Sequence, residues 1–245
     1  MKQNRLYGDL AWLWPLLSPP EDYAGEAKYW RETLREKLGP GRHHILELGV
    51  GGGHNLSHLT SDFKFTAVDR SREMLAHSIK LNPDVEHKRA DMRKVRLDRK
   101  FNAVIIHDAI SYMLTENDLL KTFRTAAAHL DKGGIFVTSP DYLTETFSDP
   151  SIHHNTRTHD ETELTYVEYT YDPDPKDSKI ETIMTYYIRE KDDLRIEQDL
   201  HISGLFPMET WRRLFERAGF IFEAVDYPVH EDKRQGYLFV GVLGG

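Results

Sequence analysis

Glycines at positions 49, 51 and 53 follow an apolar run that carries a single acid, Glu47. This order, continued by a helix-like segment from His54, predicts a strand, a tight turn and a helix. Glycine permits positive φ in such a turn and lets a ligand approach backbone that a Cβ would block. The chemistry indicated is binding of a nucleotide-like cofactor, although a glycine-rich turn by itself is also ordinary turn chemistry.

A second acidic residue supports a cofactor that contains ribose. Asp69 ends the next apolar run and follows Gly51 at close to the spacing of about 20 residues expected for an acid that binds ribose hydroxyls. One carboxylate can accept hydrogen bonds from both hydroxyls of a ribose. The glycine turn after one predicted strand and Asp69 at the end of the next therefore indicate the same kind of ligand, a nucleotide-like cofactor.

Composition limits the classes of protein. A chain of 245 residues suits one domain, 1–245, with room for an appended subdomain. Forty acidic against 32 basic residues, a net charge of −8, argue against a nucleic-acid partner, because phosphate binding needs a concentrated basic surface. No apolar run approaches the roughly 20 residues of a membrane span. With no cysteine and no recognisable signal peptide, a cytoplasmic enzyme is expected.

Strands and helices alternate through the middle of the chain. Strands are expected near 43–48, 64–69, 84–89, 101–107 and 133–139, with helices near 54–60, 72–80 and 116–130. That order predicts a parallel sheet covered on both faces, with ligands bound beyond the carboxyl ends of its strands. Polar residues or glycine follow all five predicted strands: Gly49, Asp69, Asp91, His107 with Asp108, and Asp141.

Two segments extend this core. Residues 1–40 predict a helical lid: an aromatic stretch over 3–17 either packs on the domain or covers the cofactor, and Ser18 to Glu21 has the capping-box spacing for a helix over 21–38. Residues 141–205 predict an insert that covers the substrate, with a loop over 141–160 and antiparallel strands at 162–171, 179–189 and 194–203. In the last strand Ile196, Leu200 and Ile202 share one face, and Glu197, Asp199 and His201 share the other.

A helix from Pro207 to Gly219 and a final hairpin, 220–226 with 236–242, complete the prediction. The expected fold class is α/β: a seven-stranded, mostly parallel, doubly wound (Rossmann-like) sheet with a C-terminal antiparallel hairpin and an inserted antiparallel β meander.

The motif set resembles that of class I S-adenosylmethionine-dependent methyltransferases. The resemblance rests on five segments in order: 47–53, 67–71, 90–92, 101–108 and 130–134. It implies S-adenosylmethionine as cofactor, with its amino-acid part, ribose and adenine held by Glu47, Gly49, Gly51, Asp69, Met74, Asp91 and Met92, and with His107 beside it. A dinucleotide-binding dehydrogenase also uses glycines and an acid, but the chain has no second nucleotide-binding half.

A closer resemblance covers almost the whole chain. Segments 22–27, 90–93, 144–147, 205–206 and 236–242 are similar to those of N,N-dimethyltransferases that act on nucleotide-linked amino sugars. In that family the insert after the fifth strand covers the substrate. The chain departs from the family where glycine replaces a threonine of the first motif and where His107 and Asp108 end the fourth strand. The second departure lies on the acceptor side, so the fold and cofactor are implied more directly than the amino-sugar substrate.

Methyl transfer is an in-line displacement, for which a protein mainly positions the nucleophile and excludes water. A proton acceptor is needed for a hydroxyl or a protonated amine. His107 is the first candidate for this base, with a hydrogen-bonded histidine beside the cofactor as the alternative, and Tyr112 either aims the acceptor or packs. The residues expected to face the acceptor are Trp14, Asp141, Tyr142 and His201, although His201 equally fits a solvent-facing position.

Other histidines are given structural interpretations. His129 is expected at the surface or at a helix end, where a cation is favoured, and the cluster of His153, His154 and His159 lacks metal-ligand spacing, so no metal is predicted. The expected acceptor is a nitrogen or oxygen of a small molecule. The alternative is a non-catalytic S-adenosylmethionine-binding sensor or subunit partner. The aromatic meander with Trp12 and Trp14 is compatible with a homodimer.

Overall fold

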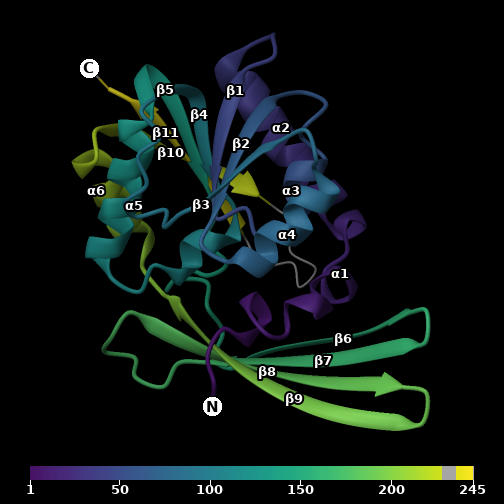
Figure 1. Cartoon of the computed structure of the whole chain (residues 1–245). Coiled ribbons are helices and arrows are strands. Elements are labelled where there is room, and N and C mark those ends of the chain that lie inside the picture. The colour runs from purple at the N-terminus through teal and green to yellow at the C-terminus, as the bar shows by residue number, and fades with distance from the viewer. Residues whose placement is uncertain (228–235, 245) are drawn as a thin grey trace.

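The computed structural model describes residues 1–227 and 236–244. Its larger sheet has the strand order β10-β11-β5-β4-β1-β2-β3, in which β1 to β5 run parallel and the β10/β11 hairpin is antiparallel (Figure 1). The strands are β1 His44–Leu48, β2 Lys64–Asp69, β3 Glu86–Arg89, β4 Phe101–Ile106, β5 Leu130–Thr138, β10 Phe220–Tyr227 and β11 Gly236–Leu243. This order confirms the predicted doubly wound sheet and its terminal hairpin.

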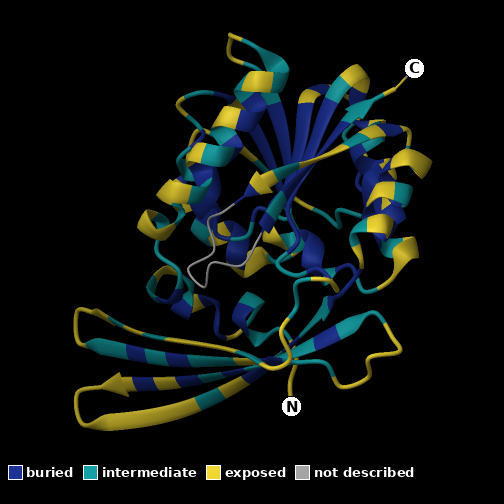
Figure 2. Cartoon of the chain, turned by 180° about the vertical axis from the view of Figure 1, so that it is seen from behind, coloured by how far each residue is buried: buried dark blue, intermediate teal, exposed yellow. Residues whose placement is uncertain are grey.

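Helices cover both faces of this sheet. Ile45 of β1 belongs to a buried cluster with Trp30 of α2, whereas Leu46, the next residue, belongs to a second cluster with Phe123 of α5. Alternate side chains of one strand thus reach opposite layers, and the central strands are buried throughout (Figure 2). The helices are α2 Ala24–Leu38, α3 His54–Ser57, α4 Arg72–Leu81, α5 Glu116–Ala128 and α6 Met208–Arg217, with a 3₁₀ turn η4 at Asp108–Tyr112.

The insert is a separate antiparallel sheet of four strands in the order β6-β7-β8-β9, seen below the larger sheet in Figure 1. Its strands are β6 Ser151–His159, β7 Thr162–Tyr171, β8 Lys179–Glu190 and β9 Asp193–Gly204. The prediction of a loop over 141–160 is therefore wrong, because 151–159 pairs along its whole length with β7. This edge strand is mostly exposed, so its sequence lacks the apolar alternation by which strands are recognised.

The N-terminal segment lies between the two sheets. It consists of short turns, η1 Arg5–Tyr7, η2 Ala11–Leu13, α1 Trp14–Leu17 and η3 Pro20–Tyr23. Its leucines pack in one cluster with the inner face of the insert: Leu6, Leu10, Leu13 and Leu17 against Leu164, Tyr166, Met184, Tyr186 and Ile188. The segment thus links the insert to the main domain.

The expected capping box is wrong. The Ser18 hydroxyl is hydrogen-bonded to the Tyr23 hydroxyl at 2.7 Å, and α2 begins only at Ala24, without a side-chain cap. The turn η3 takes up the residues that the spacing assigned to the first turn of that helix.

The polar face of β9 is the one turned towards the main domain. Asp199 and His201 are 0% and 4% exposed, whereas Ile196 on the opposite face is 56% exposed. Among the described residues, no helix is both long and apolar enough to cross a membrane.

Candidate active site

A cavity of about 530 Å³ lies at the carboxyl ends of β1 to β4. Nine of the predicted site residues line it: Trp14, Glu47, Gly49, Gly51, Asp69, Asp91, Met92, His107 and Tyr112. Four do not: Met74, Asp141, Tyr142 and His201. The parallel sheet therefore gathers residues distant in sequence at one edge, as the alternation of strands and helices predicts.

The glycine loop lies close to neighbouring residues on two sides. Gly49 has a φ of +77°, and a Cβ there would lie 2.4 Å from the Cβ of Ala109. A Cβ on Gly52 would lie 2.2 Å from Nε1 of Trp14. The loop therefore requires glycine both for its conformation and for its packing.

Asp69 organises the loop from the end of β2. Its Oδ2 accepts the backbone N–H of Gly51 at 2.9 Å, and its Oδ1 accepts that of Ser71 at 2.8 Å. Burial raises the pKa of Asp69, although these backbone hydrogen bonds oppose the effect. A carboxylate held in this way on the cavity wall fits a ribose diol.

Five side chains on the cavity wall, Asn4 and His107 among them, have buried polar atoms that make no hydrogen bond to the described residues, and the other three suit a cofactor. The atoms of these three are Oε2 of Glu47, Nε1 of Trp14 and both amide atoms of Asn55. Glu47 is 2% exposed, and burial raises its pKa to about 8. An unpaired buried polar group costs about 1–3 kcal/mol, so these groups suit a ligand that brings both an ammonium and a carboxylate. The amino-acid part of S-adenosylmethionine has both.

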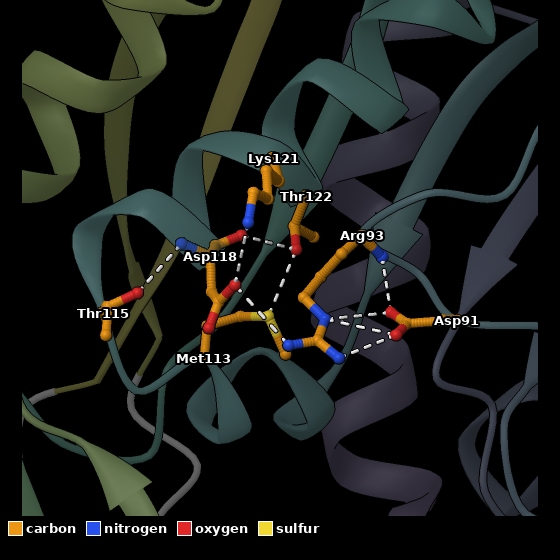
Figure 3. Close-up of polar contacts among 7 residues, drawn as sticks. All are labelled: Asp91, Arg93, Met113, Thr115, Asp118, Lys121 and Thr122. Carbon is orange, nitrogen blue, oxygen red and sulfur yellow. Dashed lines mark hydrogen bonds and ion pairs between the residues drawn. The ribbon is translucent and has the colours of Figure 1, made fainter.

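Arg93 fixes the loop after β3 (Figure 3). Its Nη2 donates to Oδ2 of Asp91 at 2.7 Å, and its Nη1 lies 3.5 Å from Oδ1 of Asp118 on α5. The Arg93 hydrogen bonds lower the pKa of Asp91 to about 2. Asp118 also donates its backbone N–H to Thr115 at the start of α5 and pairs with Lys121. The predicted adenine-flanking loop is thereby tied to a helix.

His107 is 7% exposed and lies between two carboxylates. Its Nε2 is 2.9 Å from Oε2 of Glu26, and its Nδ1 is 3.0 Å from Oδ2 of Asp108. Burial lowers the pKa of His107, but the two carboxylates outweigh burial and hold it well above its usual value. A protonated imidazole has no lone pair to accept a proton. The geometry therefore favours the second interpretation, a charged histidine beside the cofactor, over a general base.

One part of the cavity wall is aromatic. The hydroxyl of Tyr112 is 2.7 Å from that of Tyr7, another cavity residue, and 2.7 Å from Nδ1 of His201. His201 thus supports Tyr112 from behind, instead of touching the cavity or facing solvent. The side chain of Asp108 is 53% exposed and adds a carboxylate to the same wall.

The other predicted residues lie outside the wall. Met74 is 1% exposed. Asp141 donates its backbone N–H to Ser111, and the ring of Tyr142 packs edge-on against Phe147 with centroids 5.2 Å apart. For these residues, a place near the ligand stays a prediction.

Of the two positions expected for His129, the helix end is correct, because the residue is the C-cap of α5, and the surface position is wrong. The residue is 1% exposed, accepts the backbone N–H of Leu97 at Nε2, and has its pKa lowered by burial. His153 lies on β6 beside the hydroxyl of Tyr166. No group of three or more potential metal ligands occurs in the part of the chain that the structure describes.

Sequence reasoning missed Tyr7, Glu26, Asn55, Arg93 and Asp199. Asp199 had a usable signal, because it shares a strand face with His201. Tyr7 lies in the aromatic stretch over 3–17, for which covering the cofactor was one of the two predictions. Glu26 had no signal, since only the folded chain brings α2 to the cavity.

Comparisons with known proteins show what the chain is similar to. Residues 45–134 match a methyltransferase domain family. The chain is 30% identical, over 91% of its length and 92% of the relative's, to the dTDP-3-amino-3,4,6-trideoxy-alpha-D-glucopyranose N,N-dimethyltransferase of Streptomyces venezuelae. The crystal structure of Streptomyces venezuelae DesVI superposes with a TM-score of 0.82 at 27% identity, covering 96% of each chain. The sugar N-methyltransferase KedS8 of a Streptoalloteichus species gives 0.80 at 26%, covering 91% of this chain and 88% of that one.

The fold, the glycine loop and the carboxylates around it define a methyl-transferring enzyme. The chain belongs to the family of S-adenosylmethionine-dependent methyltransferases, as its full-length similarity to a curated member shows. It is an enzyme, and S-adenosylmethionine is its cofactor.

Proposed function

We propose that this enzyme transfers methyl groups to the amino nitrogen of a nucleotide-linked amino sugar. The observation that carries the proposal is the acceptor end of the cavity, where the hydroxyls of Tyr7 and Tyr112 stand near the exposed carboxylate of Asp108. These groups suit a polar acceptor that arrives as an ammonium. The amino-sugar specificity of the Streptomyces venezuelae relative supports the same substrate class.

The cavity wall has a group for each part of the cofactor. Glu47 would accept from its ammonium, while the N–H groups of Trp14 and Asn55 would donate to its carboxylate. Asp69 would hold the ribose, and the loop of Asp91 and Met92, tied by Arg93, would flank the adenine. When bound, the cofactor supplies a methyl group on a positively charged sulfur.

The chain's own residues position the acceptor and exclude water. The N-terminal lid, 1–40, would close the cavity through Tyr7, Trp14 and Tyr23, and the insert, 141–205, would back it through β9. Such confinement makes the attacking nitrogen and the methyl carbon near neighbours, which is the main requirement for an in-line displacement. An oxygen acceptor would use the same arrangement. The relatives are catalysts, which gives the alternative of a non-catalytic sensor no support.

The test is a methylation assay with matched sugars. The enzyme and S-adenosylmethionine are incubated with dTDP-linked 3-amino and 4-amino deoxysugars, with the same sugars bearing hydroxyl in place of the amine, and with the free amino sugars. Formation of the demethylated cofactor is followed by chromatography and methyl addition by mass spectrometry. We expect transfer only to the nucleotide-linked amines. Transfer to the hydroxyl sugars alone, or to none of the panel, would contradict the proposal.

A homodimer is the proposed assembly. Five large apolar side chains of the insert are at least 38% exposed, and the strand pairing puts them on one outer face: Ile152, Tyr169, Tyr187, Leu194 and Ile196. A contiguous apolar sheet face of this kind suits burial against its own copy, because a C2 contact uses the same patch twice. A cytoplasmic location is proposed from the absence of cysteine, and no nucleic-acid partner from the net charge of −8.

A further inference from the structure

Four side chains, two half-buried tyrosines and two buried polar residues, form a continuous line of hydrogen bonds from the cavity into the insert. The Tyr7 hydroxyl is 2.7 Å from that of Tyr112, which is 2.7 Å from Nδ1 of His201. Nε2 of His201 is 2.8 Å from Oδ2 of Asp199. Tyr7 belongs to η1, Tyr112 to η4, and the other two to β9. The line therefore exists only where the N-terminal segment, the main domain and the insert meet.

Asp199 sets the direction of every hydrogen bond in this line. It is 0% exposed, and its Oδ2 also accepts the backbone N–H of Leu6 at 2.8 Å. Burial raises the pKa of Asp199, but the hydrogen bonds from His201 and the backbone outweigh burial and leave it lowered, so the group is a carboxylate. A carboxylate only accepts hydrogen bonds, so Nε2 of His201 carries a proton.

The remaining directions follow along the line. In a neutral imidazole with Nε2 protonated, Nδ1 is an acceptor, so the Tyr112 hydroxyl donates to it. The oxygen of Tyr112 then accepts from the Tyr7 hydroxyl. The free lone pair of Tyr7 is left on the side of the cavity, where it can accept a proton from a ligand.

We propose that Asp199 and His201 are positioning residues that make the Tyr7 and Tyr112 pair the proton acceptor for the amine. This inference rests on the proposed function. As the amine nitrogen forms its bond to the methyl carbon, the carbon–sulfur bond breaks and its electron pair stays on sulfur. The ammonium proton passes to Tyr7, the proton of Tyr7 to Tyr112, and that of Tyr112 to Nδ1 of His201. The sequence ends with an imidazolium beside the Asp199 carboxylate.

The environment of Tyr7 and Tyr112 favours passing a proton through their hydroxyls over forming a tyrosinate anion. Burial raises the pKa of both tyrosines, so each passes a proton on without ionising. The charged and titratable groups that face the line are Asp108, Asp141, Tyr186 and Arg5. The carboxylates of Asp108 and Asp141 act on the tyrosines electrostatically and favour the arrival of a proton.

A second methyl transfer makes the relay necessary. After the first transfer the nitrogen is an ammonium without a lone pair, and it becomes a nucleophile again only when it loses a proton. A closed cavity has little water to take that proton, so the enzyme itself must take it. An acceptor that arrives as an ammonium can lose its proton to solvent before the cavity closes, whereas the monomethyl ammonium forms inside the closed cavity, so the relay residues should affect the second methyl group more than the first.

The test compares Asp199→Asn and Tyr112→Phe with Asp193→Asn, the same change on an exposed carboxylate of β9. Asparagine keeps an oxygen for His201 and Leu6 but lacks the charge that stabilises the imidazolium. We expect kcat at pH 7 to fall roughly tenfold to hundredfold in both relay variants. We also expect monomethyl product to accumulate, a smaller loss at higher pH, and cofactor affinity within twofold of wild type by calorimetry. Asp193→Asn should match wild type.

An unchanged kcat and an unchanged ratio of monomethyl to dimethyl product in folded Asp199→Asn would overturn the proposal. An equal loss of cofactor affinity would do the same, because it would show a purely structural role. Tyr112→Phe gives the answer alone if Asp199→Asn does not fold, since it keeps the ring and removes only the hydroxyl.

A measurement without any acceptor separates this inference from the proposed substrate. In protein labelled with ¹⁵N-histidine, the signal of His201 is assigned as the one lost in His201→Gln. The relay requires the tautomer with a protonated Nε2 and an accepting Nδ1. A protonated Nδ1 would refute the relay whichever acceptor the enzyme methylates. If the tautomer is correct but no amino sugar reacts, the substrate assignment fails and the relay stands.

Discussion

At the scale of single residues, the buried acid Glu47 lowers the stability of the apoenzyme and is expected to bind the cofactor's ammonium. Burial raises the pKa of Glu47 in the folded protein to about 8, from 4.5 for an exposed glutamate. A carboxyl whose pKa is raised by folding contributes stability below its unfolded pKa, and that contribution is lost as pH rises through the folded value. The apoenzyme therefore loses stability between about pH 4.5 and pH 8 because of this group.

Glu47→Gln should remove that pH dependence. The unfolding free energy of the variant minus that of wild type should rise by about 1–3 kcal/mol from pH 5 to pH 8. Urea denaturation of both proteins without cofactor measures this difference. Glu190→Gln, at an exposed site, is the control and should show no such trend. A difference between Glu47→Gln and wild type that is the same at both pH values would disprove the assignment.

Glu47 should also couple cofactor binding to proton release. At pH 7 the acid is largely protonated, and it must ionise to pair with the cofactor's ammonium. Affinity for S-adenosylmethionine should therefore rise with pH up to about 8, and calorimetry in buffers of different ionisation enthalpy should detect the released proton. In Glu47→Gln both effects should vanish and affinity should fall. Proton release that persists in this variant would point to another group.

Asp69 is expected to bind the cofactor's ribose. Asp69→Ala should weaken binding of S-adenosylmethionine and of its demethylated product about tenfold to hundredfold, because a charge-assisted hydrogen bond contributes about 1.5–3 kcal/mol. Asp84→Ala, an exposed acid beyond α4, is the control for calorimetry. Wild-type affinity in Asp69→Ala would exclude the ribose assignment.

At the scale of elements, the glycine loop and α1 are fitted to each other. A Cβ on Gly52 would lie 2.2 Å from Nε1 and 2.5 Å from Cδ1 of Trp14. Gly52→Ala should therefore displace the indole and cost about 1–3 kcal/mol of unfolding free energy. The double variant with Trp14→Ala should be no less stable than Trp14→Ala alone, because the clash is then relieved. If the losses of unfolding free energy in the two single variants add up in the double variant, the two residues do not clash.

Trp14→Phe tests the indole N–H separately, because the variant keeps an aromatic ring on α1 and removes the buried donor. We expect weaker cofactor binding with little change in stability. Titration with cofactor, followed by calorimetry, measures the first, and urea denaturation the second. Binding equal to wild type would leave Trp14 with a packing role only.

At the scale of the whole molecule, the outer face of the insert should hold two copies together. Tyr187→Lys and Ile196→Lys place charges on this apolar face, where both residues are more than a third exposed. We expect wild type to sediment as a dimer and the double variant as a monomer in analytical ultracentrifugation, because burying unpaired charges is costly. Thr60→Lys, on the loop after α3, should leave the dimer intact. A monomeric wild type would exclude this assembly.

The α/β fold and the cofactor were predicted correctly from the sequence, and nine of the predicted site residues line the cavity. Apolar runs buried on both faces and glycine at required turns are local signals, and they placed Glu47, Gly49 and Asp69 at one sheet edge before any coordinates. Where burial was partial the local signal failed. The exposed edge strand β6 was predicted as a loop, and the prediction for His129 allowed a surface position beside the helix end that it occupies, although the residue is buried.

Only the tertiary structure decided what the acceptor end of the cavity contains. The sequence left two roles open for His107, a base or a hydrogen-bonded histidine beside the cofactor, and only the fold places Glu26 of α2 and Asp108 at its two nitrogens. The line from Tyr7 to Asp199 joins residues almost 200 positions apart in sequence. Protonation and hydrogen-bond direction depend on burial and on neighbours from other elements, and no local pattern of residues carries that information.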